Sequence, residues 1–131
     1  MTAAPEPGPR ERTILIVDDE RHNRQLLEVI LASEGYAVLT ATNGDDALAM
    51  IATQPPDLVL LDVMMPGMDG YRVTARIKAG PATSHIPVIL LTALDDRNSR
   101  IHGLAAGAEA FLTKPVNRAE LCERVRALLP L

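Results

Sequence analysis

Short apolar runs recur along the chain, and each is bounded by polar or turn-forming residues. Three of these runs are continuous and rich in leucine, isoleucine and valine, which is typical of strands buried on both faces of a parallel sheet. Two further runs are shorter and weaker. The pattern predicts strands at Thr13–Val17, Tyr36–Ala41, Asp57–Leu61, Pro87–Leu91 and Glu109–Leu112.

Segments with apolar residues at every third or fourth position lie between these runs and predict helices with one buried side. The first ends near Gly35, because glycine favours the turn that terminates a helix. The next four are predicted at Asp45–Ala52, Asp69–Ala79, Asp96–Ala106 and Asn117–Leu129. The side chains expected to share the apolar sides are Leu26, Leu27, Ile30 and Leu31; Ala47, Leu48 and Ile51; Val73 and Ile77; Ile101, Leu104 and Ala105; and Leu121, Val125, Leu128 and Leu129.

Five strands that alternate with five helices indicate an α/β fold. We expect a five-stranded parallel sheet, doubly wound, with helices on both faces. In open sheets of this kind, ligands bind beyond the carboxyl ends of the strands. Polar residues that follow the predicted strands are therefore the candidates for a functional site.

The length of 131 residues suits one domain. We expect residues 1–12, which contain three prolines, to form a flexible leader and residues 13–131 to form the domain. Hydrophobic residues make up 47% of the chain and aromatic residues only 2%, so the core is expected to be aliphatic. The scarcity of aromatic rings also disfavours a stacking platform for single-stranded nucleic acid.

The formal net charge of −4 disfavours nucleic acid or an anionic membrane as a direct partner. No apolar run approaches the roughly 20 residues that a membrane span needs. Cys122 is the only cysteine, which excludes an internal disulfide and indicates a reducing compartment. We therefore expect a cytoplasmic location.

Polar residues follow four of the predicted strands. Asp18 and Asp19 follow the first strand, Asp62 the third, Thr92 the fourth, and Lys114 comes just after the fifth. Each residue alone has a purely structural explanation as a helix cap, a turn former or a solvated side chain. Because the strands are parallel, however, all five residues should meet at one edge of the sheet.

Three carboxylates at one edge would repel one another and raise one another's pKa. A hard divalent cation resolves the repulsion, and Mg²⁺ commonly takes one or two carboxylates, waters and a substrate phosphate as ligands. Lys114 and the hydroxyl group of Thr92 add groups that can contact a phosphoryl oxygen. Phosphoryl transfer needs little more from a protein than alignment and charge neutralisation.

These residues resemble the receiver domain of two-component response regulators, in particular Asp18-Asp19, Asp62 with the MMPGMDG segment that follows, Thr92-Ala93 and Lys114-Pro115. The resemblance implies a strand order of 2-1-3-4-5. It also implies that a sensor histidine kinase or a histidine phosphotransfer protein donates a phosphoryl group to Asp62, the phosphoacceptor. Outside its own phosphorylation and dephosphorylation, such a domain is not an enzyme.

The resemblance implies ligands as well. Mg²⁺, for which Mn²⁺ can substitute, would be held by Asp19, Asp62 and the backbone carbonyl of Met64, with Asp18 acting mainly through water. Lys114 would contact the phosphoryl group, and the Lys114–Pro115 peptide bond would be cis. The backbone N–H groups expected at the phosphate are those of Val63, Met64 and Ala93.

A switch is a further implication of the resemblance. Phosphorylation would draw in the Thr92 hydroxyl and let Phe111 turn inward, changing the face made by the fourth helix, fifth strand and fifth helix. An output domain, a downstream protein or a second copy in a phosphorylation-dependent homodimer would bind that face. Phe111 as an ordinary core residue stays open. Arg97 and Arg100 precede Ile101-His102-Gly103-Leu104, and this segment resembles the corresponding segment of receivers attached to cyclic-di-GMP enzymes.

Met64 and Leu94 lie two residues after Asp62 and Thr92, where they would flank the path of an attacking water. Because both side chains are apolar and orient water poorly, we expect slow self-dephosphorylation.

Three alternatives stay open from the residues alone. A phosphatase of the haloacid-dehalogenase type also uses a strand-end aspartate, but it generally needs a second acid where this chain has Met64. A flavin- or nucleotide-binding domain shares the fold class, although no GxGxxG or P-loop is present. A pseudo-receiver would bind partners without phosphorylation. The chain ends one helix after Lys114, which fits either a receiver that acts alone or part of a longer regulator.

Overall fold

The computed structural model describes residues 11–93 and 97–130. Residues 1–10 of the predicted leader lie outside this part, whereas Glu11 and Arg12 are described and exposed. In chain order the elements are β1 (Thr13–Val17), α1 (Arg21–Ser33), β2 (Ala37–Ala41), α2 (Gly44–Thr53), β3 (Leu58–Asp62), α3 (Gly70–Ala79), β4 (Val88–Thr92), α4 (Arg97–Ala106), β5 (Ala110–Thr113) and α5 (Arg118–Leu128). The predicted strands and helices are thus confirmed with small shifts at their ends, while Asp96, the predicted start of the fourth helix, lies outside the described residues.

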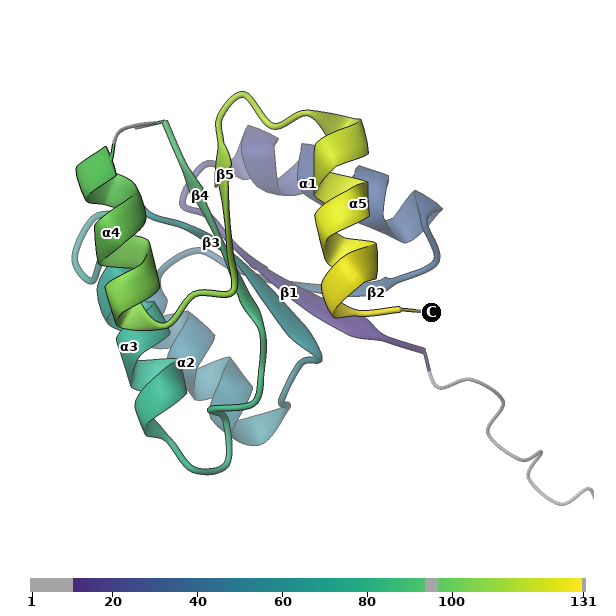
Figure 1. Ribbon diagram of the computed structural model, residues 1–131. Helices are drawn as coiled ribbons and strands as arrows, with labels where there is room; N and C mark the ends of the chain where they lie inside the picture. Colours follow the sequence, from purple (N-terminus) through teal and green to yellow (C-terminus); the bar gives the residue numbers. More distant parts are fainter. Residues whose placement is uncertain (1–10, 94–96, 131) are drawn as a thin grey trace, which may run out of the picture.

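The strands form one parallel sheet in the order β2-β1-β3-β4-β5, which confirms the expected fold class and strand order. Helices α1 and α5 cover one face, and α2, α3 and α4 cover the other (Figure 1). The strand order switches direction between β1 and β3, which lie side by side although β2 separates them in sequence. The carboxyl ends of these two strands are where a sheet of this topology binds its ligand.

Successive side chains of each strand enter two separate apolar cores, because side chains alternate between the faces of a sheet. Ile14 and Leu60 pack with α1 and α5, whereas Leu15 and Leu61 pack with α2 and α3. Burial on both faces explains why the strands read as continuous apolar runs rather than alternating ones. Strand β3 is buried along its whole length.

Three of the predicted strands, β3, β4 and β5, end one residue further along the chain than the apolar runs that mark them. The Val63 N–H donates to the Leu91 carbonyl at 2.8 Å, and the Lys114 N–H donates to the Thr92 carbonyl at 2.7 Å. These bonds extend the hydrogen-bond ladder of the sheet by one residue. Asp62 and Thr92 are therefore the last residues of β3 and β4 rather than the first residues after them.

The apolar side predicted for α4 does not face the core, which corrects the sequence-based expectation. Ile101 is 49% exposed and Leu104 is 71% exposed, and Ala105 is exposed as well. The helix instead approaches the sheet through Gly103, where an added Cβ would lie 3.0 Å from the Phe111 ring. A helix that packs through glycine leaves its larger apolar residues on the opposite side.

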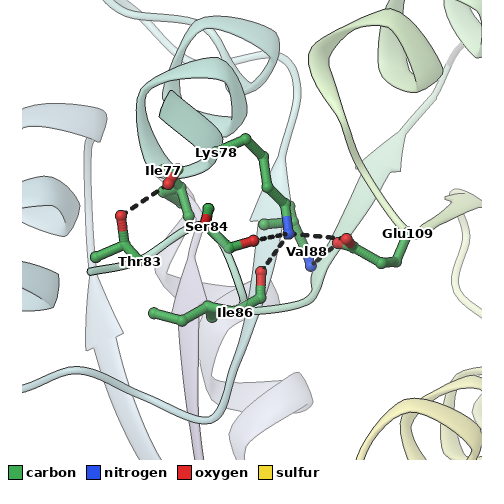
Figure 2. A network of polar contacts seen from close by, with 7 residues as sticks. All are labelled: Ile77, Lys78, Thr83, Ser84, Ile86, Val88 and Glu109. Atoms are coloured by element: carbon green, nitrogen blue, oxygen red, sulfur yellow. Dashed lines mark hydrogen bonds and ion pairs between the residues drawn. The ribbon is translucent and has the colours of Figure 1, made fainter. Parts of the chain in front are cut away.

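Lys78 braces the opposite edge of the sheet, at the amino ends of β4 and β5 (Figure 2). Its Nζ donates to the carbonyls of Ser84 and Ile86 and forms an ion pair of 2.8 Å with Glu109. The other Glu109 oxygen accepts the Val88 N–H at 2.7 Å. One lysine thus joins α3 to the segments that precede β4 and β5.

An acidic site at the carboxyl ends of the strands

Three aspartates meet at the edge of the sheet predicted from their positions after the strands. One carboxylate oxygen from each of Asp18, Asp19 and Asp62 lies within 4.8 Å of the others. Asp18 and Asp62 are 1% and 3% exposed, whereas Asp19 is exposed to solvent. The cluster is therefore closed toward the sheet and open on the side of Asp19.

The Asp18 carboxylate is only partly satisfied by protein groups. Its Oδ1 accepts the Glu20 N–H at 2.9 Å, while its buried Oδ2 accepts no hydrogen bond from the described residues. A buried carboxylate oxygen without a hydrogen bond is costly. Oxygen-rich sites of this kind suit Mg²⁺ or Mn²⁺, so the residues present fit the cation that the sequence predicts.

Lys114 supplies the positive charge at this edge. Its Nζ lies 3.0 Å from Asp62 Oδ1 and 3.6 Å from Asp18 Oδ2. Burial alone would lower the pKa of Lys114, but the two carboxylates outweigh it and the pKa is raised above 10.5. Lys114 therefore carries a positive charge at neutral pH. The Lys114–Pro115 peptide bond is cis, as the resemblance implies.

The pKa of Asp62 is raised above 3.8, chiefly because burial disfavours the charged carboxylate. The charge of Asp18 raises it further, while the hydrogen bonds from Lys114 and from the Met64 N–H oppose the shift. A cation at the cluster would favour the ionised, nucleophilic form of Asp62.

The loop between β3 and α3 returns the backbone to Asp62. The Met64 N–H donates to Asp62 Oδ1 at 3.3 Å, and the Gly70 N–H donates to the Val63 carbonyl at 3.0 Å. A Cβ on Gly70 would lie 2.7 Å from the Asp62 carbonyl oxygen, so this approach requires glycine. Asp69 caps α3 by accepting the Arg72 N–H. These contacts account for Asp69 and Gly70 at the end of the MMPGMDG segment.

The remaining predicted site residues divide into those at this edge and those away from it. Thr92 is fully buried at the end of β4, and Ala93 follows it on the surface. The Val63 N–H already donates to Leu91, which corrects the expectation that it faces a phosphate. Phe111 is half-buried against α4 and lies outside the cluster. Leu94 lies outside the described residues.

A mostly apolar cavity that the sequence pattern did not predict lies beside the cluster. It has a volume of about 150 Å³, and its polar lining residues are Asp18, Asn23 and Lys114. The apolar lining comes from α1, from β4 and from the segment after Lys114: Leu26, Leu27, Ile30, Leu91, Pro115 and Val116. The exposure of Leu26, at 54%, shows that the apolar side of α1 is wider than its buried stripe. The signal in the sequence for this cavity was the presence of four apolar residues within two turns of α1.

In the part of the chain that the structure describes, no helix has the length and apolar character needed to cross a membrane.

Comparisons with known proteins agree with this geometry. The family model of the response regulator receiver domain matches residues 14–126. Response regulator PleD of Caulobacter vibrioides is 56% identical over 115 residues, which cover 88% of this chain and 25% of PleD. The phosphate regulon transcriptional regulatory protein PhoB of Pseudomonas aeruginosa is 43% identical over 118 residues, or 90% of this chain and 52% of PhoB. The chain thus spans about a quarter to a half of the length of these relatives.

Solved structures show the same similarity. A response regulator from Chloroflexus aurantiacus superimposes with a TM-score of 0.89 at 38% identity, covering 93% of this chain and 100% of that chain. Chemotaxis protein CheY4 of Vibrio cholerae superimposes with a TM-score of 0.86 at 30% identity, covering 91% and 99% of the two chains.

Receiver domains bind Mg²⁺ at an acidic pocket and interact with histidine kinases and output domains, and the aspartate cluster of this chain fits that description. The sheet order, the strand-end residues and the match over residues 14–126 lead to one conclusion. The chain belongs to the family of response regulator receiver domains, the phosphoacceptor domains of two-component signalling.

Proposed function

We propose that Asp62 is the residue that accepts the phosphoryl group. The observation that carries this proposal is a buried carboxylate held 3.0 Å from a lysine within a cluster of three aspartates. One Asp62 oxygen would form a bond to phosphorus while the bond from phosphorus to the donor's histidine nitrogen breaks. The products are an aspartyl phosphate and a free histidine on the donor.

The side chains around Asp62 have distinct proposed roles. Lys114 contacts the phosphoryl oxygens, because its charge is already aimed at the acceptor. The Thr92 hydroxyl and the N–H groups of Met64 and Ala93 complete the phosphate contacts. None of these groups needs to form a covalent bond, since phosphoryl transfer is promoted mainly by positioning and charge neutralisation.

Mg²⁺, or Mn²⁺ in its place, belongs to the proposed site and would neutralise the carboxylates and the transferred phosphoryl oxygens. The proposed protein ligands are Asp19, Asp62 and the Met64 carbonyl. Asp18 would act mainly through water, and its unbonded Oδ2 is the acceptor available for that water. The exposure of Asp19 provides the route by which a hydrated ion arrives.

The proposal includes partners. A sensor histidine kinase or a histidine phosphotransfer protein would donate the phosphoryl group. The face of α4, β5 and α5 would contact an output domain, a downstream protein or a second copy in a phosphorylation-dependent homodimer. Thr92 and Phe111 would form the switch that changes this face. A cyclic-di-GMP enzyme as the output, and a cytoplasmic location, belong to the same proposal.

The direct test is incubation of the protein with Mg²⁺ and acetyl phosphate, followed by intact mass measurement. Wild type should gain one phosphoryl group, and Asp62→Asn should gain none because the amide is not a nucleophile of comparable strength. Asp45→Asn is the matched control, since Asp45 is an exposed carboxylate at the start of α2. Equal labelling of Asp62→Asn and wild type would show that the acceptor is another residue.

A further inference from the structure

Met64 differs from the other described methionines in its exposure. It is 61% exposed, whereas Met65 is 7% exposed and Met50 and Met68 are half-buried. An exposed thioether can be oxidised, and the sulfoxide that results is polar where the thioether was apolar. Exposure therefore separates Met64 chemically from its neighbours.

The position of Met64 is set by backbone contacts rather than by its side chain. Its N–H donates to Asp62 Oδ1 at 3.3 Å, and the Met65 N–H donates to the Val63 carbonyl at 3.2 Å. Met65 turns into the core between the sheet and α2 and α3, and Met64 is left on the surface beside Asp62. It lines an open pocket of the β3–α3 loop with Pro66 and Asp69 among other residues.

We propose that Met64 is an oxidation site through which peroxide shortens the lifetime of the phosphate on Asp62. This inference rests on the proposed role of Asp62. In the oxidation step the Met64 sulfur attacks one oxygen of hydrogen peroxide. A sulfur–oxygen bond forms, the peroxide oxygen–oxygen bond breaks, and a proton moves to the departing oxygen to give water. Sulfur is oxidised by two electrons and peroxide is reduced.

The effect on the phosphate follows from hydrogen bonding. A thioether is a weak acceptor and leaves a nearby water without a preferred orientation. A sulfoxide oxygen can accept a hydrogen bond from a water that attacks phosphorus. In that hydrolysis a water–phosphorus bond forms and the bond from phosphorus to Asp62 oxygen breaks, releasing phosphate. One added hydrogen bond in the transition state corresponds to about a fivefold faster loss of phosphate.

The test combines peptide mapping with phosphate decay. The protein is treated with hydrogen peroxide, the peroxide is removed, and peptide mass mapping locates the added oxygen. Samples with and without treatment are then phosphorylated with acetyl phosphate and Mg²⁺, the donor is removed, and phosphate loss is followed by intact mass. Among the methionines that the structure describes, we expect oxygen first on Met64, and we expect a phosphate half-life about fivefold shorter after treatment.

Three methionine variants and one background substitution make the result specific. Met64→Leu should lose the response to peroxide, whereas Met68→Leu should keep it. Met64→Gln, which places an amide oxygen at the same position, should shorten the half-life without peroxide. A Cys122→Ser background removes the remaining oxidisable sulfur type, and Cys122 is 5% exposed in any case.

Two outcomes would overturn the inference. One is oxidation of Met50 or Met68 ahead of Met64, and the other is an unchanged half-life in protein oxidised at Met64. Failure of the untreated protein to gain a phosphoryl group is a separate result, because it would contradict the role of Asp62 rather than that of Met64.

Discussion

At the scale of the residue, the proposed function of Asp62 and the stability of the fold oppose each other. A carboxylate with 3% exposure next to the buried Asp18 lowers the stability of the folded state. Its pKa is raised chiefly by burial, so Asp62 takes up a proton more readily in the folded state than in the unfolded state. The stability contributed by this group is present below its unfolded pKa, near 3.8, and is lost as the pH rises through the folded value.

Asp62→Asn should therefore raise the thermal unfolding midpoint in the absence of divalent cation at neutral pH. The same measurement with Mg²⁺ should narrow the difference, because a ligand that binds only the folded wild type stabilises it. Calorimetry with and without EDTA measures both effects. Asp45→Asn serves as the exposed control. A lower midpoint for Asp62→Asn without cation would mean that the Lys114 contact outweighs burial.

At the scale of the element, the amino ends of β4 and β5 depend on one lysine. Lys78 Nζ contacts two backbone carbonyls and the Glu109 carboxylate (Figure 2). The stem of the side chain runs beneath Gly107, whose φ of +102° lets the chain turn there. Loss of the charge would leave the carbonyls of Ser84 and Ile86 without this donor.

We expect Lys78→Met, which keeps the apolar stem, to lower the free energy of unfolding by about 2 kcal/mol, since hydrogen bonds to charged groups are worth about that much. Arg126→Met is the comparison, because Arg126 makes an ion pair of 3.1 Å with Glu34 on the surface. That exposed pair should contribute less than about 1 kcal/mol. Urea denaturation of both variants measures the difference, and equal losses would contradict the proposed brace.

At the scale of the whole molecule, an apolar surface lies on α4. Ile101 and Leu104 are 49% and 71% exposed. A cavity of about 170 Å³ is lined by Leu104 together with Phe111 from β5 and Arg124 from α5, among others. This surface therefore joins the three elements of the proposed interaction face.

The double variant Ile101→Ser/Leu104→Ser should change the free energy of unfolding little, by about 0.5 kcal/mol, because surface substitutions seldom do more. It should abolish any self-association that appears on phosphorylation, since removing apolar surface removes its driving force. Sedimentation velocity before and after acetyl phosphate treatment measures this. A phosphorylated double variant that still associates would place the interface elsewhere.

Local sequence patterns were sufficient to predict the strands and helices and to pick out the polar residues at the ends of the strands. Continuous apolar runs predicted the strands because burial on both faces selects apolar residues at every position. Asp18, Asp19, Asp62 and Lys114 were predicted to meet because parallel strands deliver their carboxyl ends to one edge, and the structure brings them together. The strand order came from the family resemblance and not from the residue pattern.

Packing decided what periodicity could not. A helical repeat shows that Ile101 and Leu104 share a side of α4, but not whether that side faces the sheet. Gly103 is the residue that faces the sheet, because only glycine lets the ring of Phe111 approach so closely. Neighbouring strands and loops likewise decide which acceptor receives the Val63 N–H and how far Met64 is exposed to solvent. The sequence by itself determined which groups gather at the edge of the sheet, whereas tertiary contacts determined which groups are buried, bonded or open to solvent.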